Sequence, residues 1–246
     1  MEQRIKEIIF EKIRFINGNY KTIKKRFVRG GVMVVPAAPA LKNIHQDKLY
    51  YKALKNSSFA ILDSGYLCLL LRIIKNIEVT KFSGLKFLRS FFKDKENLKK
   101  KIFLIDPSRE ESIKNKKLLN KIGVKKKLSQ YIAPIYNTKN IVDKKLLLII
   151  KSQKPRFIII NLGGGKQEIL ANYLNSNLNY KFSIFCTGAA ISFLTGSQAK
   201  IPKWIDYFYL GWLMRCLVSP IEYTKRYSKA FGLINLVIKS KIKIIK

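Results

Sequence analysis

The chain has 246 residues, of which 48% are apolar, so it is long and hydrophobic enough to form a complete core and is not a disordered chain. Its 49 lysines and arginines against 15 acidic residues give a formal net charge of +34, which predicts attraction to polyanions such as nucleic acid, anionic lipid headgroups or phosphorylated substrates. A single histidine, His45, and the absence of any CxxC pattern argue against a zinc site or a histidine-dependent catalytic triad.

The cysteines and the apolar runs indicate a cytoplasmic protein. Cys68, Cys186 and Cys216 each lie in apolar sequence, which is typical of buried, reduced thiols. Charged residues interrupt the N-terminus, so we expect no signal peptide. No apolar run reaches the ~18 to 20 residues that a membrane-spanning helix requires.

The predicted elements alternate between helices and apolar strands along the chain. An amphipathic helix is expected first, because Ile5, Ile8, Ile9 and Ile13 recur at helical spacing. Strands are predicted at Phe27–Val35, Phe59–Leu62, Ile102–Ile105, Phe157–Ile160 and Phe182–Cys186, and helices at Leu41–Leu54, Ser64–Ile74, Ile113–Leu119 and Ile141–Ile150. Strands that are apolar throughout and separated by helices predict a Rossmann-like α/β fold, with a mostly parallel sheet covered on both faces.

The C-terminal part of the chain is rich in basic residues. From Lys200 onward there are ten lysines and arginines and two acids, interspersed with aromatic and aliphatic side chains. This mixture is typical of a helix at a membrane interface, although a helix packed on the core explains residues 202–218 equally well. The lysine-rich segment from Ala230 on favours the membrane. We therefore expect an α/β catalytic domain over residues 1–200 and a helical, membrane-associating appendage over residues 201–246.

The stretch Asn161-Leu-Gly-Gly-Gly-Lys-Gln-Glu168 directly follows an apolar run, which predicts a strand, a glycine turn and a helix. Its three glycines match neither G-x-G-x-x-G nor a P-loop. A turn of this kind frees backbone N–H groups at a helix N-terminus, where they can hold a phosphate or a sugar hydroxyl. Helix capping alone is the alternative explanation, and Glu168 suits a helix start in either case.

This turn resembles the G-x-P-K-Q-E signature of the WecG/TagA/CpsF glycosyltransferases, and other motifs over about residues 30–228 are similar to the same family. Gly188–Gly196 resembles G-a-a-F-D-F-x-x-G, Ile201–Trp204 resembles A-P-x-W, Leu210–Arg215 resembles L-E-W-x-x-R, and Pro220–Tyr227 resembles P-x-R-x-x-R-R-Y. Upstream, Asp63 stands where the family has its Asp-Gly. Ser83-Gly84 resembles R-x-T-G, with Lys81 in place of the arginine.

The resemblance implies an inverting glycosyltransferase of cell-surface polysaccharide or teichoic acid synthesis. Such enzymes move an N-acetylhexosamine-type sugar, commonly N-acetylmannosamine or its uronic acid, from a UDP-sugar to a sugar on a polyprenyl diphosphate. They act at the inner face of the cell membrane, often self-associate, and use no cofactor and no metal held by a D-x-D motif. We therefore expect an anionic membrane surface as a partner. We expect no nucleic-acid partner, because no RNP, KH or helix-turn-helix pattern occurs.

The same resemblance implies roles for particular residues. Asp63 is the candidate general base that takes the proton from the acceptor hydroxyl. Lys81 would stabilise the leaving diphosphate. The donor would contact Gly163, Gly164, Gly165, Gln167 and Glu168, and the lipid diphosphate or nucleotide would contact Arg215, Lys225 and Arg226. Each role has a structural alternative: an N-cap for Asp63, a solvated surface position for Lys81, and ordinary ion pairing or headgroup attraction for the C-terminal cations.

Several positions depart from the family pattern. The family's T-x-N pair is absent from residues 34–39, Ser192 replaces an aspartate, Gly211 replaces a glutamate and Gly165 replaces a proline. These changes bear on the identity of the sugar more than on the fold. Two other function classes remain open: a nucleic-acid-binding module, suggested by the charge, and a catalytically inert scaffold of polysaccharide assembly, suggested by the missing T-x-N pair.

Overall fold

A computed structural model describes residues 5–124, 127–137, 140–196 and 232–246. The strands are β1 (Glu7–Phe10), β2 (Ile13–Ile16), β3 (Gly31–Val34), β4 (Phe59–Ile61), β5 (Ile102–Asp106), β6 (Leu128–Ile132), β7 (Phe157–Ile160), β8 (Ser183–Cys186) and β9 (Lys243–Ile245). The helices are α1 (Tyr20–Phe27), α2 (Ala38–Lys42), α3 (Lys48–Asn56), α4 (Gly65–Lys75), α5 (Gly84–Lys93), α6 (Lys95–Leu98), α7 (Arg109–Ile122), α8 (Lys144–Gln153), α9 (Lys166–Asn177), α10 (Ser192–Thr195) and α14 (Leu233–Lys239), with a 3-10 turn, η2 (Gly188–Ile191), before α10.

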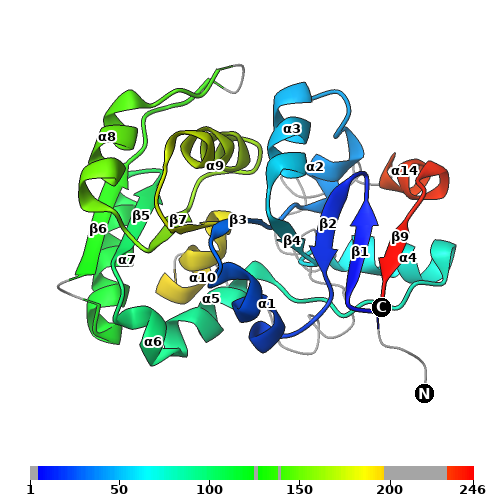
Figure 1. The fold of residues 1–246 in the computed structure, drawn as a ribbon, viewed down its shortest axis with the longest axis horizontal. Helices are drawn as coiled ribbons and strands as arrows, with labels where there is room; N and C mark the ends of the chain where they lie inside the picture. Colours follow the sequence, from blue (N-terminus) through cyan, green and yellow to red (C-terminus); the bar gives the residue numbers. More distant parts are fainter. Residues whose placement is uncertain (1–4, 125–126, 138–139, 197–231) are drawn as a thin grey trace.

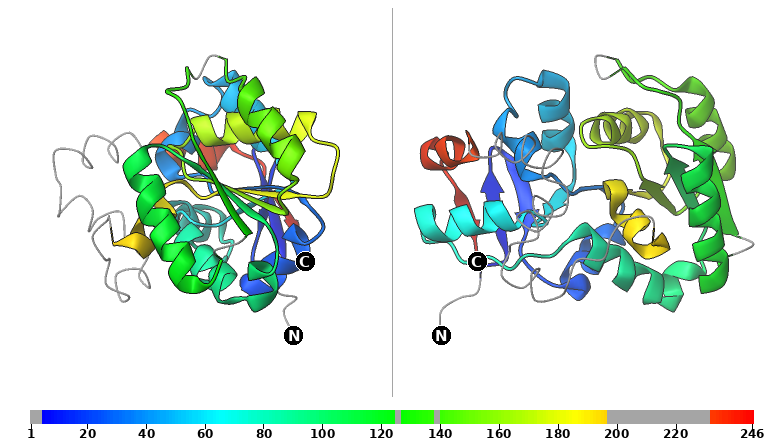
Figure 2. Two further views of the ribbon diagram at one scale, coloured as in Figure 1. Left: turned by 90° about the vertical axis from the view of Figure 1, so that its left-hand side faces the viewer. Right: turned by 180° about the vertical axis from the view of Figure 1, so that it is seen from behind.

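The strands form one nine-stranded sheet in the order β6-β5-β7-β8-β3-β4-β2-β1-β9. Every neighbouring pair from β6 to β2 is parallel, whereas β1 is antiparallel to both β2 and β9. Helices cover both faces of the sheet (Figure 1, Figure 2). The mostly parallel, Rossmann-like α/β fold predicted from the alternation of helices and apolar strands is confirmed.

Two hydrophobic cores lie on the two faces of the sheet, and successive strand residues alternate between them. In β7, Ile158 and Ile160 join the first core, whereas Phe157 and Ile159 join the second. The first core includes buried residues of α2, α3, α4, α8, α9 and α14, and the second includes those of α1, α5, α7 and η2. Since both faces are covered, the strands need apolar residues at every position, and this explains their lack of polar alternation.

The N-terminal helix expected from the isoleucine spacing is wrong, because this segment forms a β-hairpin. β1 and β2 pair antiparallel, with Phe10 opposite Ile13. The two residues between them, Glu11 and Lys12, have φ values of 51° and 61°. Positive φ at both central residues is the geometry of the tight turns that join twisted strands. This turn usually contains glycine or asparagine, so a Glu-Lys pair gave no local indication of it.

The C-terminal residues 232–246 are part of this same domain, so for them the expectation of a separate membrane-facing helix is wrong. Leu233 and Val237 of α14 are fully buried in the first core, and β9 extends the sheet by pairing with β1. The lysines of this segment do not prevent packing, because Lys241 and Lys243 are exposed. Residues 201–231 lie outside the described residues. Among the described helices, none has both the length and the hydrophobicity to cross a bilayer.

Other helices and strands begin or end at residues that differ from the sequence predictions. The strand expected from Phe27 begins at Gly31, because Phe27 is the last residue of α1 and Val28 is its C-cap. The helix expected over 41–54 is divided into α2 and α3, and Asp47 begins α3 by accepting a hydrogen bond from the backbone N–H of Tyr50 at 2.9 Å. The strand β6 and the helix α1 were not predicted.

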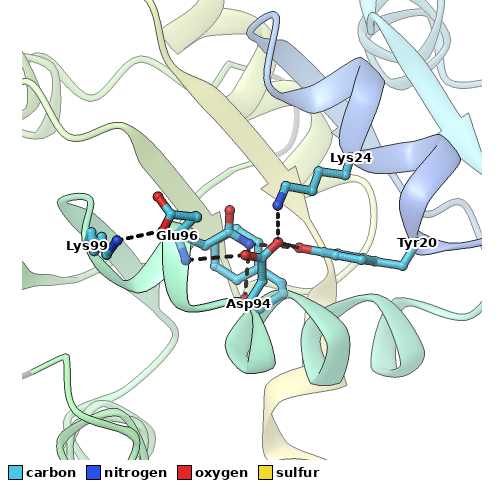
Figure 3. A network of polar contacts seen from close by, with 7 residues as sticks. Tyr20, Lys24, Asp94, Glu96 and Lys99 are labelled. Atoms are coloured by element: carbon cyan, nitrogen blue, oxygen red, sulfur yellow. Dashed lines mark hydrogen bonds and ion pairs between the residues drawn. The ribbon is translucent and has the colours of Figure 1, made fainter.

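A polar network fixes the C-terminal end of α5 against α1 (Figure 3). The carboxylate of Asp94 accepts hydrogen bonds from the Tyr20 hydroxyl at 3.1 Å and from the Lys24 ammonium group. It also accepts from the backbone N–H of Glu96 at 3.3 Å, which begins α6. Asn97 donates to the Tyr20 hydroxyl at 2.7 Å. This network lies at the end of α5 that is away from the site described next.

Candidate active site

The carboxyl ends of five neighbouring strands lie at one edge of the sheet. Ile105, Ile160, Cys186, Val34 and Ala60 are in register across β5, β7, β8, β3 and β4. After β5 the chain passes through α7 to the outer neighbour β6, whereas after β7 it passes through α9 to β8 on the other side. Open α/β sheets bind ligands where such connections diverge at the carboxyl edge. This edge is therefore the candidate site.

Asp63 stands two residues beyond the end of β4 and is bound to the start of α5. Its Oδ1 accepts a hydrogen bond from the backbone N–H of Gly84 at 2.9 Å. One step earlier, the backbone N–H of Phe82 donates to the carbonyl of Leu62 at 2.8 Å. These two hydrogen bonds bring together the motifs around Asp63 and Gly84, which are 21 residues apart in the sequence.

Asp63 is not the N-cap of the following helix, which was the alternative to its role as a base. Ser64 begins α4, and its hydroxyl accepts from the backbone N–H of Leu67 at 3.2 Å. The Asp63 carboxylate instead binds the N-terminus of α5, not that of α4, the helix that follows it in the chain.

Lys81 lies beside the segment that carries Asp63, because the next residue, Phe82, donates its N–H to the carbonyl of Leu62. The charges of Lys81 and Asp63 both act on the thiol of Cys68 in α4. Burial raises the pKa of Cys68 to about 12; the positive charge of Lys81 lowers that pKa, and the negative charge of Asp63 raises it. The predicted base and the predicted cation for the leaving group are therefore placed near each other.

The glycine turn joins β7 to α9 as the sequence predicts. Gly163 and Gly164 are exposed, and a Cβ at either position would meet no atom of the described chain within 4 Å. Gly165 has a φ of +88°, a left-handed conformation that favours glycine. Proline, which has φ near −65°, could not adopt it, so the replacement of the family's proline accompanies a different local backbone.

The side chains of Gln167 and Glu168 connect this turn to its surroundings through hydrogen bonds. Glu168 accepts from the backbone N–H of Gly165 at 2.7 Å and from the side-chain amide of Gln167 at 2.9 Å. The side-chain oxygen of Gln167 accepts from the backbone N–H of Gly188 at 2.8 Å, in the turn that follows β8. Both side chains are buried. These contacts fix the first turn of α9 to the turns after two different strands.

The environment of Glu168 favours its neutral form. Burial raises the pKa of Glu168 to about 7, and the hydrogen bonds from Gly165 and Gln167 offset only part of this effect. Burial and then the nearby Glu168 carboxylate also raise the pKa of Tyr50 in α3. The side chain of Glu168, predicted from sequence to face the donor, has both oxygens engaged by the protein.

The part of the site around Asp63 and the part around Gln167 meet at Gly84. A Cβ on Gly84 would lie 3.8 Å from the carbonyl oxygen of Thr187. The N–H of Gly84 is bound to Asp63, and the residue after Thr187 is bound to Gln167. Asp63 and Gln167, 104 positions apart in the chain, therefore lie at the same edge of the sheet.

A further polar cluster at this edge was not predicted from the sequence. Asp106, the last residue of β5, is fully buried, and its Oδ1 accepts from the side-chain amides of Asn115 and Asn161, each at 2.7 Å. Its Oδ2 accepts from Gln130 at 3.1 Å. Burial raises the pKa of Asp106, and these hydrogen bonds partly offset the shift. The sequence feature that could have indicated this cluster is Asp106, a carboxylate at the end of an otherwise apolar strand.

Other residues singled out in the sequence lie elsewhere. His45 is bound to Glu11 at 2.7 Å, away from the carboxyl edge. Cys68 and Cys186 are buried free thiols. Arg215, Lys225, Arg226, Cys216, and the tryptophans at 204 and 212 are outside the described residues. Within the described ranges, no three His, Cys, Asp or Glu side chains are grouped as a metal site would require.

Comparison with known proteins agrees with the motifs. A search of curated proteins finds no match. The family model described as "Glycosyl transferase WecG/TagA/CpsF family" matches residues 12–246, nearly the whole chain, including β2, the glycine turn and the C-terminal strand. With this coverage and the α/β fold described above, the chain belongs to the WecG/TagA/CpsF family of glycosyltransferases.

Proposed function

We propose that this protein is an inverting glycosyltransferase that moves an N-acetylhexosamine-type sugar from a UDP-sugar to a sugar carried on a polyprenyl diphosphate. The observation that carries this proposal is the meeting of Asp63 and Gln167 at the carboxyl edge, through Gly84 and Gly188, in a chain of this family. We place the reaction in the cytoplasm at the inner face of the cell membrane, in cell-surface polysaccharide synthesis.

In an inverting transfer, the acceptor hydroxyl attacks the anomeric carbon while the nucleoside diphosphate leaves from the opposite face. One carboxylate must take the hydroxyl proton as the new bond forms. We assign this role to Asp63, which is only partly buried. The hydrogen bond from Gly84 to Oδ1 keeps the carboxylate in one orientation, so Oδ2 is the oxygen that takes the proton.

Negative charge develops on the departing diphosphate, and positive groups near it lower the barrier. We assign Lys81 to this role as a point charge, since a lysine cannot form the two-pronged contact of an arginine. The N-terminus of α9 adds a partial positive charge and backbone N–H groups. Gly163 and Gly164, which are exposed and have no side chain, let a ligand approach this backbone closely.

Gln167 and Glu168 act in this scheme by fixing the glycine turn, since each is bound to backbone N–H groups of the turns. Arg215, Lys225 and Arg226 keep the role implied by the family motifs, that of reaching the lipid diphosphate or the nucleotide. Exposed lysines of α14 and β9 provide positive charge for an anionic membrane surface.

The test is turnover by the purified full-length chain, supplied with a polyprenyl-diphosphate-GlcNAc analogue and a panel of UDP-sugars, with UDP release as the signal. We expect turnover with at least one donor and a loss of at least ~100-fold in Asp63→Asn, the scale of losing a general base. Asparagine keeps an oxygen for the Gly84 N–H, so folding is preserved.

The matched control is Asp94→Asn at the opposite edge of the sheet, which changes the network with Tyr20 and Lys24 and leaves turnover intact. Full activity in Asp63→Asn would remove Asp63 from the mechanism. Failure of the wild-type chain to release UDP from any donor would contradict the proposed donor class.

A further inference from the structure

A row of buried polar residues at the carboxyl edge has no part in the mechanism above. Asp106 ends β5, and Asn161 and Thr187 directly follow β7 and β8. Each stands one position beyond Ile105, Ile160 and Cys186, which are in register, so the three lie on adjacent strands about 4.8 Å apart. Their exposed fractions are 0%, 6% and 7%.

The contacts of Asp106 fix the orientation of the Asn161 side chain. The amide nitrogen of Asn161 donates to Asp106 Oδ1, which also receives the amide of Asn115. The reversed orientation of Asn161 would bring its amide oxygen against the carboxylate oxygen, two acceptors with no hydrogen between them. With Asp106 ionised, the amide oxygen of Asn161 is therefore held on the side away from its carboxylate.

That oxygen lacks a partner within the described part of the chain. Asn161 Oδ1 and Thr187 Oγ1 are enclosed side-chain atoms with no hydrogen bond from or to the described residues. Native folds rarely leave such atoms unpaired, because each has given up its hydrogen bonds with water. One is an acceptor and the other a hydroxyl, and both directly follow strands at the edge where the glycine turn begins.

We propose that Asn161 and Thr187 together bind a hydroxyl group of the sugar nucleotide and that Asp106 is the positioning residue for Asn161. A hydroxyl donates its hydrogen to Asn161 Oδ1 while its oxygen accepts from the Thr187 hydroxyl, so one group satisfies both atoms. A phosphate has only acceptor oxygens at neutral pH and cannot satisfy Asn161. We take the ligand group to be a hydroxyl, of the ribose or of the transferred hexose, because a single oxygen then satisfies both atoms.

The position of the pair agrees with the proposed function, on which this inference rests. Asn161 is two residues before Gly163, in the turn assigned to the diphosphate. Thr187 immediately precedes Gly188, whose backbone N–H donates to Gln167. The carbonyl of Thr187 lies beside Gly84. A hydroxyl bound between Asn161 and Thr187 would therefore be part of the same ligand whose diphosphate meets the glycine turn.

The test is calorimetric binding of UDP and of UDP-N-acetylglucosamine to the full-length chain. We expect Asn161→Ala and Thr187→Val each to weaken binding about 5- to 10-fold, the scale of one neutral hydrogen bond. A loss seen with both probes identifies a ribose hydroxyl, and a loss confined to UDP-N-acetylglucosamine identifies a hexose hydroxyl. The matched control is Asn177→Ala on α9, whose amide binds only the Tyr173 carbonyl of its own helix among the described groups.

Deoxy analogues separate a ligand contact from a structural role. If the ribose is bound, 2′-deoxy- or 3′-deoxy-UDP binds the wild-type chain more weakly than UDP, and Thr187→Val binds both equally. Asp106→Ala should lose the same preference for the hydroxyl, because no side-chain oxygen remains to accept from the Asn161 amide and fix its orientation. A change in overall stability alone would lower the affinity for both nucleotides without changing their ratio.

Two results would overturn the inference in different ways. Wild-type affinities for both probes in Asn161→Ala and Thr187→Val, with unchanged melting temperatures, would mean that enclosed water satisfies these atoms, while the Asp63→Asn result would still stand. No binding of either nucleotide by the wild-type chain would overturn both this inference and the proposed function. Should Asn161→Ala fail to fold, Thr187→Val decides, since valine has the shape of threonine without its hydroxyl.

Discussion

The side-chain oxygen of Gln167 accepts a hydrogen bond from the backbone N–H of Gly188 at 2.8 Å, and this contact joins the turns that follow β7 and β8. The amide nitrogen of the same side chain donates to Glu168, which in turn accepts from Gly165. Two turns of the site are thus connected through two consecutive buried residues. The site is held by side-chain-to-backbone contacts within the protein, in advance of any ligand.

Removing the Gln167 side chain should destabilise the fold as well as the site. Gln167→Ala leaves the N–H of Gly188 and one oxygen of Glu168 without their partner, so we expect the free energy of unfolding to fall by about 1–3 kcal/mol. Urea unfolding followed by circular dichroism measures this. The control is Gln46→Ala, an exposed position where a change within about 0.5 kcal/mol is expected. Equal effects at the two glutamines would contradict the structural role given to Gln167.

The three glycines of the turn should respond differently to alanine. Gly165→Ala forces a side chain into φ of +88° and should lower the free energy of unfolding by about 1 kcal/mol. Gly163 and Gly164 lack positive φ and have open space at the Cβ position, so alanine there should leave stability unchanged or raise it slightly. If the turn meets the diphosphate, Gly163→Ala and Gly164→Ala nevertheless weaken UDP binding. Undiminished binding in both would place the ligand away from the turn.

The ionisation of Glu168 should make stability depend on pH. Its pKa is about 7 in the folded chain against 4.5 as its ordinary value, so the folded state holds a proton that the unfolded state releases between these pH values. The contribution of Glu168 to stability is therefore greatest below pH 4.5, falls as pH rises toward 7, and changes little above that. The shift corresponds to about 3 kcal/mol.

Glu168→Gln provides the comparison, because glutamine has the same shape and does not titrate. Urea midpoints at pH 5 and pH 8 should differ more in the wild-type chain than in this variant. The other titrating groups are common to both proteins and cancel in the difference. Identical pH profiles would show that Glu168 does not carry the proton.

Membrane attachment can be tested without disturbing the fold. Deleting the C-terminus would also remove β9 and the buried Leu233, so surface substitutions are the cleaner change. We expect replacement of the four exposed lysines Lys239, Lys241, Lys243 and Lys246 by alanine to weaken sedimentation with phosphatidylglycerol vesicles, by about 1 kcal/mol per lysine near the surface. The same four changes at the exposed lysines Lys100, Lys116, Lys117 and Lys121 serve as the control. Equal losses in the two variants would indicate only a general effect of net charge.

The order of the apolar strands and the glycine turn could be predicted from the sequence because both depend on local patterns. A strand buried on two faces must be apolar at every position, so Phe157–Ile160 and Ile102–Ile105 are visible as short uninterrupted runs. Helices between such strands require a parallel sheet, and a parallel sheet brings all carboxyl ends to one edge. The grouping of Asp63 with the glycine turn follows from that rule together with the family motifs.

The pairing of distant segments was decided by the tertiary structure alone. The N-terminal isoleucines fit a helical period and a hairpin alike, and only the pairing of β1 with both β2 and β9 selects the hairpin. Lys243 of β9 is exposed, while the backbone of β9 pairs with β1. Likewise, Asp106 and Asn161 are 55 positions apart, and their contact arises from the adjacency of β5 and β7. Periodicity records which residues are buried, whereas the neighbour that buries them depends on the order of strands in the sheet.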